Sequence, residues 1–252
     1  MTTTKRIALI TGSARGIGFA TAMRLARLGH RVLLADRLEA VYESAKSLRE
    51  QGCDAQAHVG DTATPNGVQA TVEAVKTAYG GVDILVNNAG ISPKHNGAKY
   101  LTVDTPFAEW QEVMRINLEG PFLMSRACVP LMRERGWGRI VSISSLAGRT
   151  GSRWPSTSYS ASKAGVLGFS RVLAEEVGRF GITVNCIAPG RIETPMSGES
   201  GQEVQKAYAA AIPVGRLGVP DDIAAAIAFL ASDGASNMTG AVFDVNGGVY
   251  MN

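Results

Sequence analysis

Cysteine and histidine are scarce in this sequence, and their spacing excludes several kinds of site. The three cysteines are an odd number without C-x-x-C spacing, so neither a disulfide framework nor a zinc or thiol redox motif is expected. Cys53, Cys128 and Cys186 are therefore interpreted as small apolar residues in a reducing compartment. The three histidines lie far apart along the chain, so the sequence predicts no metal site.

Long apolar runs and blocks of one charge are also absent. The longest apolar run, residues 223–231, has nine residues, whereas a membrane-spanning helix needs roughly 20. The four apolar residues at positions 7–10 are too few for the core of a signal peptide. The formal net charge is only +3, and Lys and Arg are scattered. We expect a cytoplasmic protein with neither a membrane nor a nucleic acid as partner.

Glycine, by contrast, is plentiful. The chain has 29 glycines among 252 residues but only 10 prolines, whereas glycine makes up roughly 7% of a typical protein. The glycines follow no collagen-like period, so the surplus is expected at special backbone positions. The length suits an α/β protein with a single catalytic domain over residues 1–252.

Short apolar runs alternate with longer helical patterns along the whole chain. Such alternation predicts a parallel sheet covered by helices on both faces, which is a doubly wound α/β fold of the Rossmann type. A less regular stretch, residues 193–218, is interpreted as a mobile substrate lid or a long surface loop. The predicted strands are 7–10, 32–35, 55–59, 84–86, 140–143, 183–187 and 241–243, and the predicted helices are 16–29, 38–51, 66–79, 107–135, 158–179 and 220–231.

The first strand is followed directly by a glycine-rich turn and a helix. Gly12, Gly16 and Gly18 form a G-x-x-x-G-x-G pattern, which lets the backbone turn tightly and approach a pyrophosphate at the helix N-terminus. A strand-to-helix turn of this kind is also found where no nucleotide binds. The turn therefore indicates a nucleotide site only together with other residues.

Asp36 closes the second strand, where a carboxylate would accept hydrogen bonds from an adenosine ribose and repel a 2′-phosphate. This position predicts NAD in preference to NADP. Two alternatives stay open. Asp36 could only cap the following helix, and Arg15 and Arg37 nearby could tolerate a phosphate.

Tyr159 and Lys163 stand four residues apart in a predicted helix and so share one face. An ammonium beside a phenol favours the phenolate and would lower the pKa of the tyrosine from its usual value of about 10. Tyr159 could then exchange a proton with a substrate hydroxyl. An isolated pair of this kind is more often two surface residues, so its meaning depends on the rest of the chain.

Taken in order, these residues resemble the short-chain dehydrogenase/reductase family over nearly the whole chain. The resemblance implies a strand order of 3-2-1-4-5-6-7, with the cofactor lying across the carboxyl ends of the strands. The motifs that carry it are Thr11-Gly-x-x-x-Gly-x-Gly18, Asp61, Asn87-Asn-Ala-Gly90, Asn117, Ser144-Ser145, Tyr159-x-x-x-Lys163, Pro189-Gly190 with Thr194, and Asn246-Gly247-Gly248.

The same resemblance implies a catalytic set of Asn117, Ser145, Tyr159 and Lys163. Tyr159 would be the general acid or base, and Ser145 would hydrogen-bond the substrate oxygen. Lys163 would lower the pKa of the tyrosine and hold the nicotinamide ribose, and Asn117 would hold a water behind the lysine. The spacing from Ser145 to Tyr159 is one position wider than usual in the family, so Ser144 is a rival; the residues after Ser145 match the family's register.

The resemblance also implies which residues hold the cofactor. Asp61 would accept a hydrogen bond from the adenine amino group, beside the backbone N–H of Thr62, and residues 88–90 would line the adenosine ribose. Ile192 and Thr194 would hold the carboxamide. The complete set is Gly12, Arg15, Gly16, Ile17, Gly18, Asp36, Arg37, Asp61, Thr62, Asn88, Ala89, Gly90, Tyr159, Lys163, Pro189, Gly190, Ile192 and Thr194.

The implied function is an NAD-dependent oxidoreductase that interconverts a secondary alcohol and a ketone. We hypothesise a small anionic substrate held by cationic side chains, because such a clamp fixes orientation. The alternatives are an NADPH-dependent 3-oxoacyl-acyl-carrier-protein reductase and a non-catalytic nucleotide sensor. Because members of the family usually pair their two long helices, here residues 107–135 and 158–179, the resemblance also implies a homotetramer or homodimer. The candidate substrate residues are Lys94, His95, Ser145, Arg153, Trp154 and Tyr159.

Overall fold

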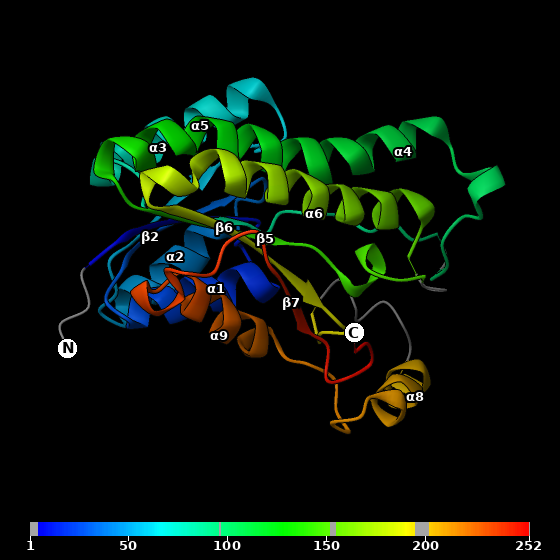
Figure 1. Cartoon of the computed structure of the whole chain (residues 1–252). Coiled ribbons are helices and arrows are strands. Elements are labelled where there is room, and N and C mark those ends of the chain that lie inside the picture. Colours follow the sequence, from blue (N-terminus) through cyan, green and yellow to red (C-terminus); the bar gives the residue numbers. More distant parts are fainter. Residues whose placement is uncertain (1–4, 96, 152–154, 195–201, 252) are drawn as a thin grey trace.

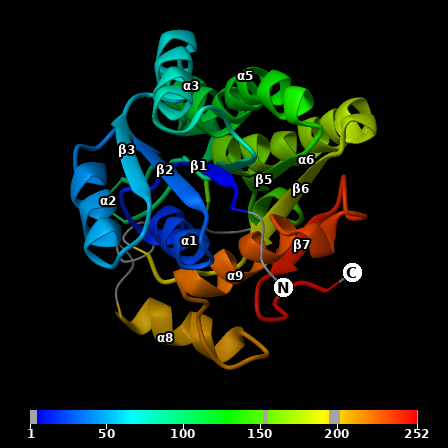
Figure 2. The same ribbon diagram turned by 90° about the vertical axis from the view of Figure 1, so that its left-hand side faces the viewer.

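The computed structural model describes residues 5–95, 97–151, 155–194 and 202–251, and for residues 202–206 the backbone alone. Seven parallel strands form one sheet in the order β3-β2-β1-β4-β5-β6-β7, so the predicted doubly wound fold is confirmed (Figure 2). The chain crosses over after β3, from one edge of the sheet to its middle. The strands are β1 (Ile7–Thr11), β2 (Arg31–Asp36), β3 (Ala55–Val59), β4 (Ile84–Asn87), β5 (Gly138–Ile143), β6 (Ile182–Pro189) and β7 (Val242–Val245).

Helices cover both faces of the sheet. On one face lie α3 (Pro65–Tyr79), α5 (Gly120–Arg135) and α6 (Thr157–Val177), and on the other lie α1 (Gly16–Arg27), α2 (Val41–Glu50) and α9 (Pro220–Leu230) (Figures 1 and 2). Because side chains alternate along a strand, β1 sends Ala8 and Ile10 into one core and Ile7 and Leu9 into the other. Among the described residues, no helix has both the length and the apolar composition needed to cross a membrane.

The helix predicted at residues 107–135 is interrupted by a π-helical turn. Helix α4 (Phe107–Met114) runs into the turn η2 (Arg115–Glu119), and α5 follows directly (Figure 1). A π turn widens the backbone ladder by one residue and is frequent at functional sites. Here it contains the buried Asn117. The hydrophobic period continues through the turn, which is why the sequence predicted one helix.

The stretch that looked irregular, residues 193–218, contains helix α8 (Gln202–Ala211). The expectation from the sequence, that no helix forms there, was wrong. Figure 1 shows α8 beyond the end of β7 at which that strand's arrow points. The stem of the segment is tied together, because Ile192 forms an isolated parallel bridge with Gly218. Residues 195–201, between the two, lie outside the described part of the chain.

Candidate active site

Tyr159 and Ser145 meet at the carboxyl end of β5. Tyr159 lies in the first turn of α6, whose N-cap, Ser156, accepts a hydrogen bond from the Tyr159 backbone N–H at 3.3 Å. Ser145 follows β5 in an extended backbone conformation and caps the 3₁₀ turn η3 (Leu146–Gly148). The side chains of Ser145 and Tyr159 share a hydrogen bond. The structure thus joins the two groups expected to face a substrate oxygen.

Lys163 lies one helical turn after Tyr159 and is only 4% exposed. Its ammonium donates a hydrogen bond to the Ile143 carbonyl at 2.6 Å, and Nζ lies 5.8 Å from the centre of the Tyr159 ring. Burial disfavours a charged amine and lowers the pKa of Lys163 to about 8. The lysine is therefore still protonated at neutral pH, held between the end of β5 and the tyrosine.

The pKa of Tyr159 differs from the sequence-based expectation. Burial raises it above its usual value, and the hydrogen bond with Ser145 opposes this shift without cancelling it. The expected lowering by Lys163 is not found, because the ammonium is bound to the Ile143 carbonyl and burial penalises a phenolate. At neutral pH Tyr159 therefore carries its proton.

The structure separates the two serines that the sequence left as rivals. Ser144 is 2% exposed, and its hydroxyl donates to the Lys163 carbonyl at 2.8 Å. That hydroxyl is committed to packing α6 against β5. Ser145 instead accepts from the Ala147 backbone N–H at 3.1 Å and hydrogen-bonds Tyr159. Its position favours Ser145 as the residue that meets the substrate.

Asn117 joins the π turn to the loop after β4. It is fully buried; its Oδ1 accepts from the Ile91 N–H at 2.8 Å, and its Nδ2 donates to the Ile91 carbonyl at 2.9 Å. Nδ2 also lies 3.2 Å from Ser162 Oγ on α6. A Cβ on Gly90 would lie 3.2 Å from Asn117 Oδ1 and 3.4 Å from Lys163 Nζ. Asn117 thus fixes the backbone beside the lysine.

The glycine-rich turn is held against the end of β4. Asn88 donates its side-chain amide to the carbonyls of Thr11 and Gly12, at 3.0 and 2.8 Å. The Thr11 hydroxyl accepts from the backbone N–H groups of Asn88 and Ala89, both at 3.1 Å. Gly12 has a φ of +64°, and a Cβ on Gly18 would lie 2.3 Å from the Gly12 oxygen. Only glycine fits this approach of turn and helix.

Helix α1 presents a free N-terminus at this turn. Its N-cap residue, Arg15, makes no capping side-chain hydrogen bond, and the first turn of α1 contains no acidic side chain. The backbone N–H groups of residues 16–18 therefore keep a partial positive charge that suits a phosphate group. The bare glycine surface and the uncapped amides fit the pyrophosphate of a dinucleotide.

Asp36 lies beside the same turn. Its Oδ2 accepts from the Ala14 N–H at 2.9 Å and its Oδ1 from the Leu38 N–H at 3.0 Å. The N-cap of α2 is Ala40, so Asp36 does not cap that helix, and one alternative reading is excluded. The side chains of Arg15 and Arg37 are exposed, so the other alternative, a tolerated phosphate, stays open.

Asp61 is tied to an arginine that sequence reasoning missed. Its Oδ1 accepts from the Ala63 N–H and its Oδ2 from Arg115 Nη1, both at 2.9 Å. Burial acts to raise the pKa of Asp61, but these two donors outweigh it and hold the pKa below its usual value. Arg115 also forms a two-pronged ion pair with Glu112. Arg115 could have been found from the sequence by its position two residues before Asn117.

The last cofactor candidates lie where β6 ends. Pro189 is the final residue of β6, and a Cβ on Gly190 would lie 2.9 Å from the Cα of Asn246. Ile192 is 7% exposed and faces Gly218, where a Cβ would lie 2.4 Å from Ile192 Cδ1. The chain after β6 therefore packs at Gly190 directly against the backbone of Asn246, just after β7.

Most of the candidate substrate cations already have partners. His95 Nε2 lies 2.6 Å from Glu109 Oε2, and the His95 ring stacks on Tyr100 with ring centres 4.0 Å apart. Arg149, which follows the turn after Ser145, pairs with Asp244 at 3.1 Å. Lys94 also has an interaction partner. The other two candidates, Arg153 and Trp154, lie outside the described residues.

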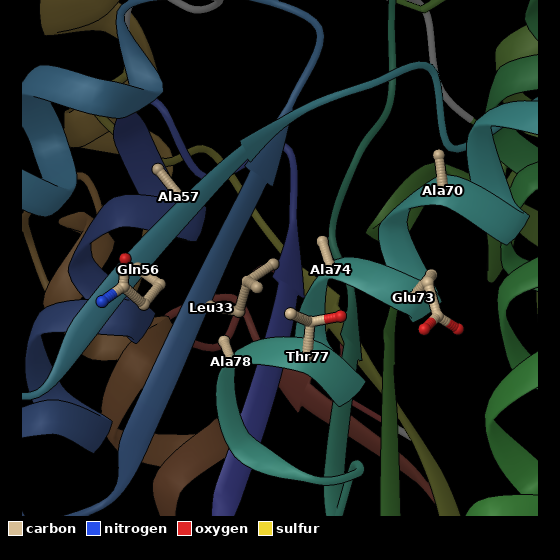
Figure 3. Close-up of a pocket in the computed structure, with 8 residues that line it drawn as sticks. All are labelled: Leu33, Gln56, Ala57, Ala70, Glu73, Ala74, Thr77 and Ala78. Atoms are coloured by element: carbon tan, nitrogen blue, oxygen red, sulfur yellow. The ribbon is translucent and has the colours of Figure 1, made fainter.

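A separate hollow of about 560 Å³ lies between α3 and the strands β2 and β3 (Figure 3). Its single ionisable lining group, Glu73, pairs with Lys76 at 3.0 Å, so the hollow offers no obvious chemistry. In the described part of the chain, no three His, Cys, Asp or Glu side chains gather as metal ligands. The hollow is lined by Leu33, Gln56, Ala57, Ala70, Glu73, Ala74, Thr77 and Ala78.

Comparison with known proteins assigns the family. A family model described as Enoyl-(Acyl carrier protein) reductase matches residues 12–250. The chain belongs to the short-chain dehydrogenase/reductase family. It is therefore an oxidoreductase, as the motifs predicted. The family's members share the Rossmann-type sheet seen here.

Three relatives illustrate the similarity. The 3-oxoacyl-(acyl-carrier-protein) reductase of Pseudomonas aeruginosa is 41% identical over 247 residues, covering 98% of each chain. A crystal structure of a 3-oxoacyl-(acyl-carrier protein) reductase with bound NAD from Brucella melitensis matches with a TM-score of 0.93 and 37% identity, over 100% of this chain and 94% of that one. A crystal structure of a single-residue variant of actinorhodin polyketide ketoreductase with NADPH matches with a TM-score of 0.92 and 36% identity, over 97% of each chain.

The glycine turn gives a first test. In Gly18→Ala, the new Cβ would meet the Gly12 oxygen and Ser13 Cα at 2.3 and 2.8 Å, so the turn must open. We expect NADH binding, followed by fluorescence titration, to weaken at least 10-fold, since a misplaced turn loses phosphate contacts worth about 1.4 kcal/mol or more.

Gly178→Ala, at the C-terminal end of α6 and with an ordinary helical φ of −55°, is the matched control. No atom lies within 4 Å of its added Cβ, so the variant should bind NADH normally and gain up to about 1 kcal/mol in stability. Unchanged NADH affinity in Gly18→Ala would show that the turn does not hold the cofactor.

Proposed function

We propose that this chain reduces the keto group of a 3-oxoacyl thioester carried by an acyl carrier protein. The observation that carries the proposal is the placement of Tyr159 beside Ser145 and Lys163, in a chain 41% identical over 98% of its length to a reductase of that name. The relatives favour this reaction over the broader alcohol dehydrogenase first inferred from the sequence.

The site residues divide the work of the reduction. A bound nicotinamide would supply the hydride to the carbonyl carbon of the substrate. Ser145 donates a hydrogen bond to the carbonyl oxygen, and Tyr159 transfers its phenolic proton to that oxygen as the hydroxyl forms. Lys163 holds its ammonium beside Tyr159 and would face the nicotinamide ribose. Asn117 keeps the Ile91 backbone and α6 in place behind the lysine.

The cofactor would lie across the carboxyl ends of the strands. The turn at residues 12–18 and the uncapped start of α1 would hold its pyrophosphate. Asp61 and Thr62 would face the adenine, residues 88–90 the adenosine ribose, and residues 189–194 the carboxamide. Asp36 would accept from the ribose hydroxyls, so we propose that NAD(H) is preferred although relatives are known with NAD and with NADPH.

The partners of His95 and Arg149 bear on the substrate class. Each of these side chains already interacts with a carboxylate of the chain itself, so neither supports the small anionic substrate hypothesised from the sequence. A neutral keto group next to a thioester needs no cationic clamp. The proposal therefore replaces the anionic substrate with an acyl group.

We also propose that the chain self-associates as a homodimer or homotetramer through α5 and α6. Phe122 on α5 and Val172 on α6 are 44% and 59% exposed, and Phe122 meets Phe169 edge-on with ring centres 6.1 Å apart. Apolar side chains exposed on two adjacent long helices are the kind of surface that a two-fold contact covers.

Turnover of a thioester tests the proposal. With acetoacetyl-coenzyme A as a soluble substrate, the protein should oxidise NADH or NADPH, followed by the loss of the reduced cofactor's absorbance. Tyr159→Phe removes the proton donor and should lower kcat by roughly 100-fold or more while cofactor binding persists. Tyr42→Phe, on the exposed Tyr42, is the control and should be fully active.

Two outcomes would count against it. Turnover of simple secondary alcohols without any thioester reduction would return the chain to the broader dehydrogenase. No turnover with any alcohol, ketone or thioester, with cofactor binding intact, would favour the nucleotide sensor.

The cofactor preference is tested at Asp36. Asp36→Asn keeps the shape and one acceptor oxygen but removes the charge that repels a 2′-phosphate. The ratio of kcat/KM with NADH to that with NADPH should fall about 10-fold or more, because hydrogen bonds to a charged group contribute about 1.5–3 kcal/mol. Glu39→Gln removes a neighbouring exposed charge and should leave the ratio unchanged. A wild-type preference for NADPH would refute the assignment to Asp36.

The pKa directions predict the pH profile of reduction. Burial raises the pKa of Tyr159, so the phenol stays protonated through the neutral range, and Lys163 with a pKa of about 8 loses its charge first. The kcat for ketone reduction should be constant near neutral pH and decline as pH rises through about 8. Initial rates in a constant-ionic-strength buffer series measure this. A rate that rises with pH through the pKa of Lys163 would contradict the proposed role of that lysine.

A further inference from the structure

Arg149 and Asp244 form a largely buried ion pair at the edge of the active site. Arg149 Nη2 lies 3.1 Å from Asp244 Oδ2, and the two side chains are 13% and 20% exposed. The Arg149 guanidinium also lies over the Tyr250 ring, 5.3 Å from its centre. Partly desolvated pairs like this one resist separation, because breaking them leaves a charge without a partner.

The arginine directly follows the turn that carries Ser145. Ser145 caps η3, and Arg149 is the C-cap of the same turn, with its N–H bonded to the Leu146 carbonyl at 3.0 Å. The hydroxyl that meets Tyr159 and the guanidinium held by Asp244 therefore belong to the two ends of one short turn. Because η3 is so short, a shift of Arg149 moves Ser145 as well.

One side of η3 is fixed independently of the ion pair. A Cβ on Gly148 would lie 2.7 Å from the Lys163 carbonyl carbon, so the turn rests on the backbone of α6. The side of η3 at Arg149 has the Asp244 carboxylate as its anchor. Asp244 is on β7, in register with Ala188 of β6, one residue before Pro189. The pair therefore links the Ser145 turn to the strand ends that precede the proposed carboxamide site.

We propose that the Arg149–Asp244 ion pair positions Ser145 against Tyr159, so that both members of the pair are positioning residues for the reduction. The pair clamps the turn from β7 while Gly148 holds it against α6. Asp244 Oδ1 is buried and finds no hydrogen-bond donor among the described residues, so within that part of the chain the carboxylate depends on Arg149. This inference rests on the proposed role of Ser145 in the reaction.

Substitution of Arg149 tests the inference. Arg149→Met keeps an apolar stem but removes the charge. We expect kcat for thioester reduction to fall between about 10-fold and 100-fold, as for a misplaced reacting group, while KM for the cofactor changes little. Arg149→Lys still reaches the carboxylate with a charge and should restore most of kcat. The double variant Arg149→Met with Asp244→Asn should be no slower than Arg149→Met alone.

The pH profile of the reverse reaction separates positioning from general destabilisation. The Ser145 hydrogen bond acts to lower the pKa of Tyr159, so a displaced Ser145 should move the ascending limb of alcohol oxidation to higher pH in Arg149→Met. The matched control is Arg135→Met, which breaks the Arg135–Asp83 pair at 3.2 Å away from η3. Arg135→Met should lower the melting temperature without changing kcat or the pH of the ascending limb of alcohol oxidation.

Each outcome has a defined meaning. The inference would be overturned if folded Arg149→Met had the wild-type kcat and the wild-type pH profile of alcohol oxidation. Ser145→Ala is measured alongside: if it keeps full activity, the proposed role of Ser145 fails, and if it is inactive while Arg149→Met is normal, only the positioning role fails. If Arg149→Met does not fold, Asp244→Asn decides by the same two measurements.

Discussion

The contact between Lys163 and the end of β5 is the interaction on which the rest of the site depends. The lysine ammonium donates to the Ile143 carbonyl, and the Ser144 hydroxyl donates back to the Lys163 carbonyl. Two hydrogen bonds of opposite direction therefore join the same helix and strand end. Helix α6 cannot slide along β5 without breaking both, and each break would leave a buried polar group unsatisfied. Tyr159 lies on α6 and Ser145 follows β5, so the spacing between these two residues is fixed as well.

Close backbone contact also fixes other parts of the site. Gly148 rests on the main chain of Lys163, Gly18 on that of Gly12, and Gly190 on that of Asn246. At each position a methyl group would force the two segments apart. The glycine surplus seen in the composition thus has a structural explanation at these places: glycine lets elements from different parts of the chain meet without side chains between them.

The fold could be read from the sequence, but several contacts of the site could not. Alternating short apolar runs and helical patterns give the seven strands, because both faces of a parallel sheet are buried. The π turn at Asn117 could not be predicted, because the Asn117 side chain forms hydrogen bonds with Ile91, which is 26 residues away in the sequence. The Arg115–Asp61 and Arg149–Asp244 ion pairs could not be predicted for the same reason, because each joins residues distant in sequence. Local patterns carry no information about such partners.

The protonation of Tyr159 and Lys163 also depends on burial, which the spacing of two residues does not reveal. Mutual attraction alone favours a phenolate beside an ammonium, and the Lys163 Nζ lies 5.8 Å from the centre of the Tyr159 ring. Removing two ions from water costs several kcal/mol for each. Burial therefore outweighs attraction, which explains why the pKa of the phenol is raised and that of the amine lowered. A ketone entering this site meets a neutral phenol with a proton to give.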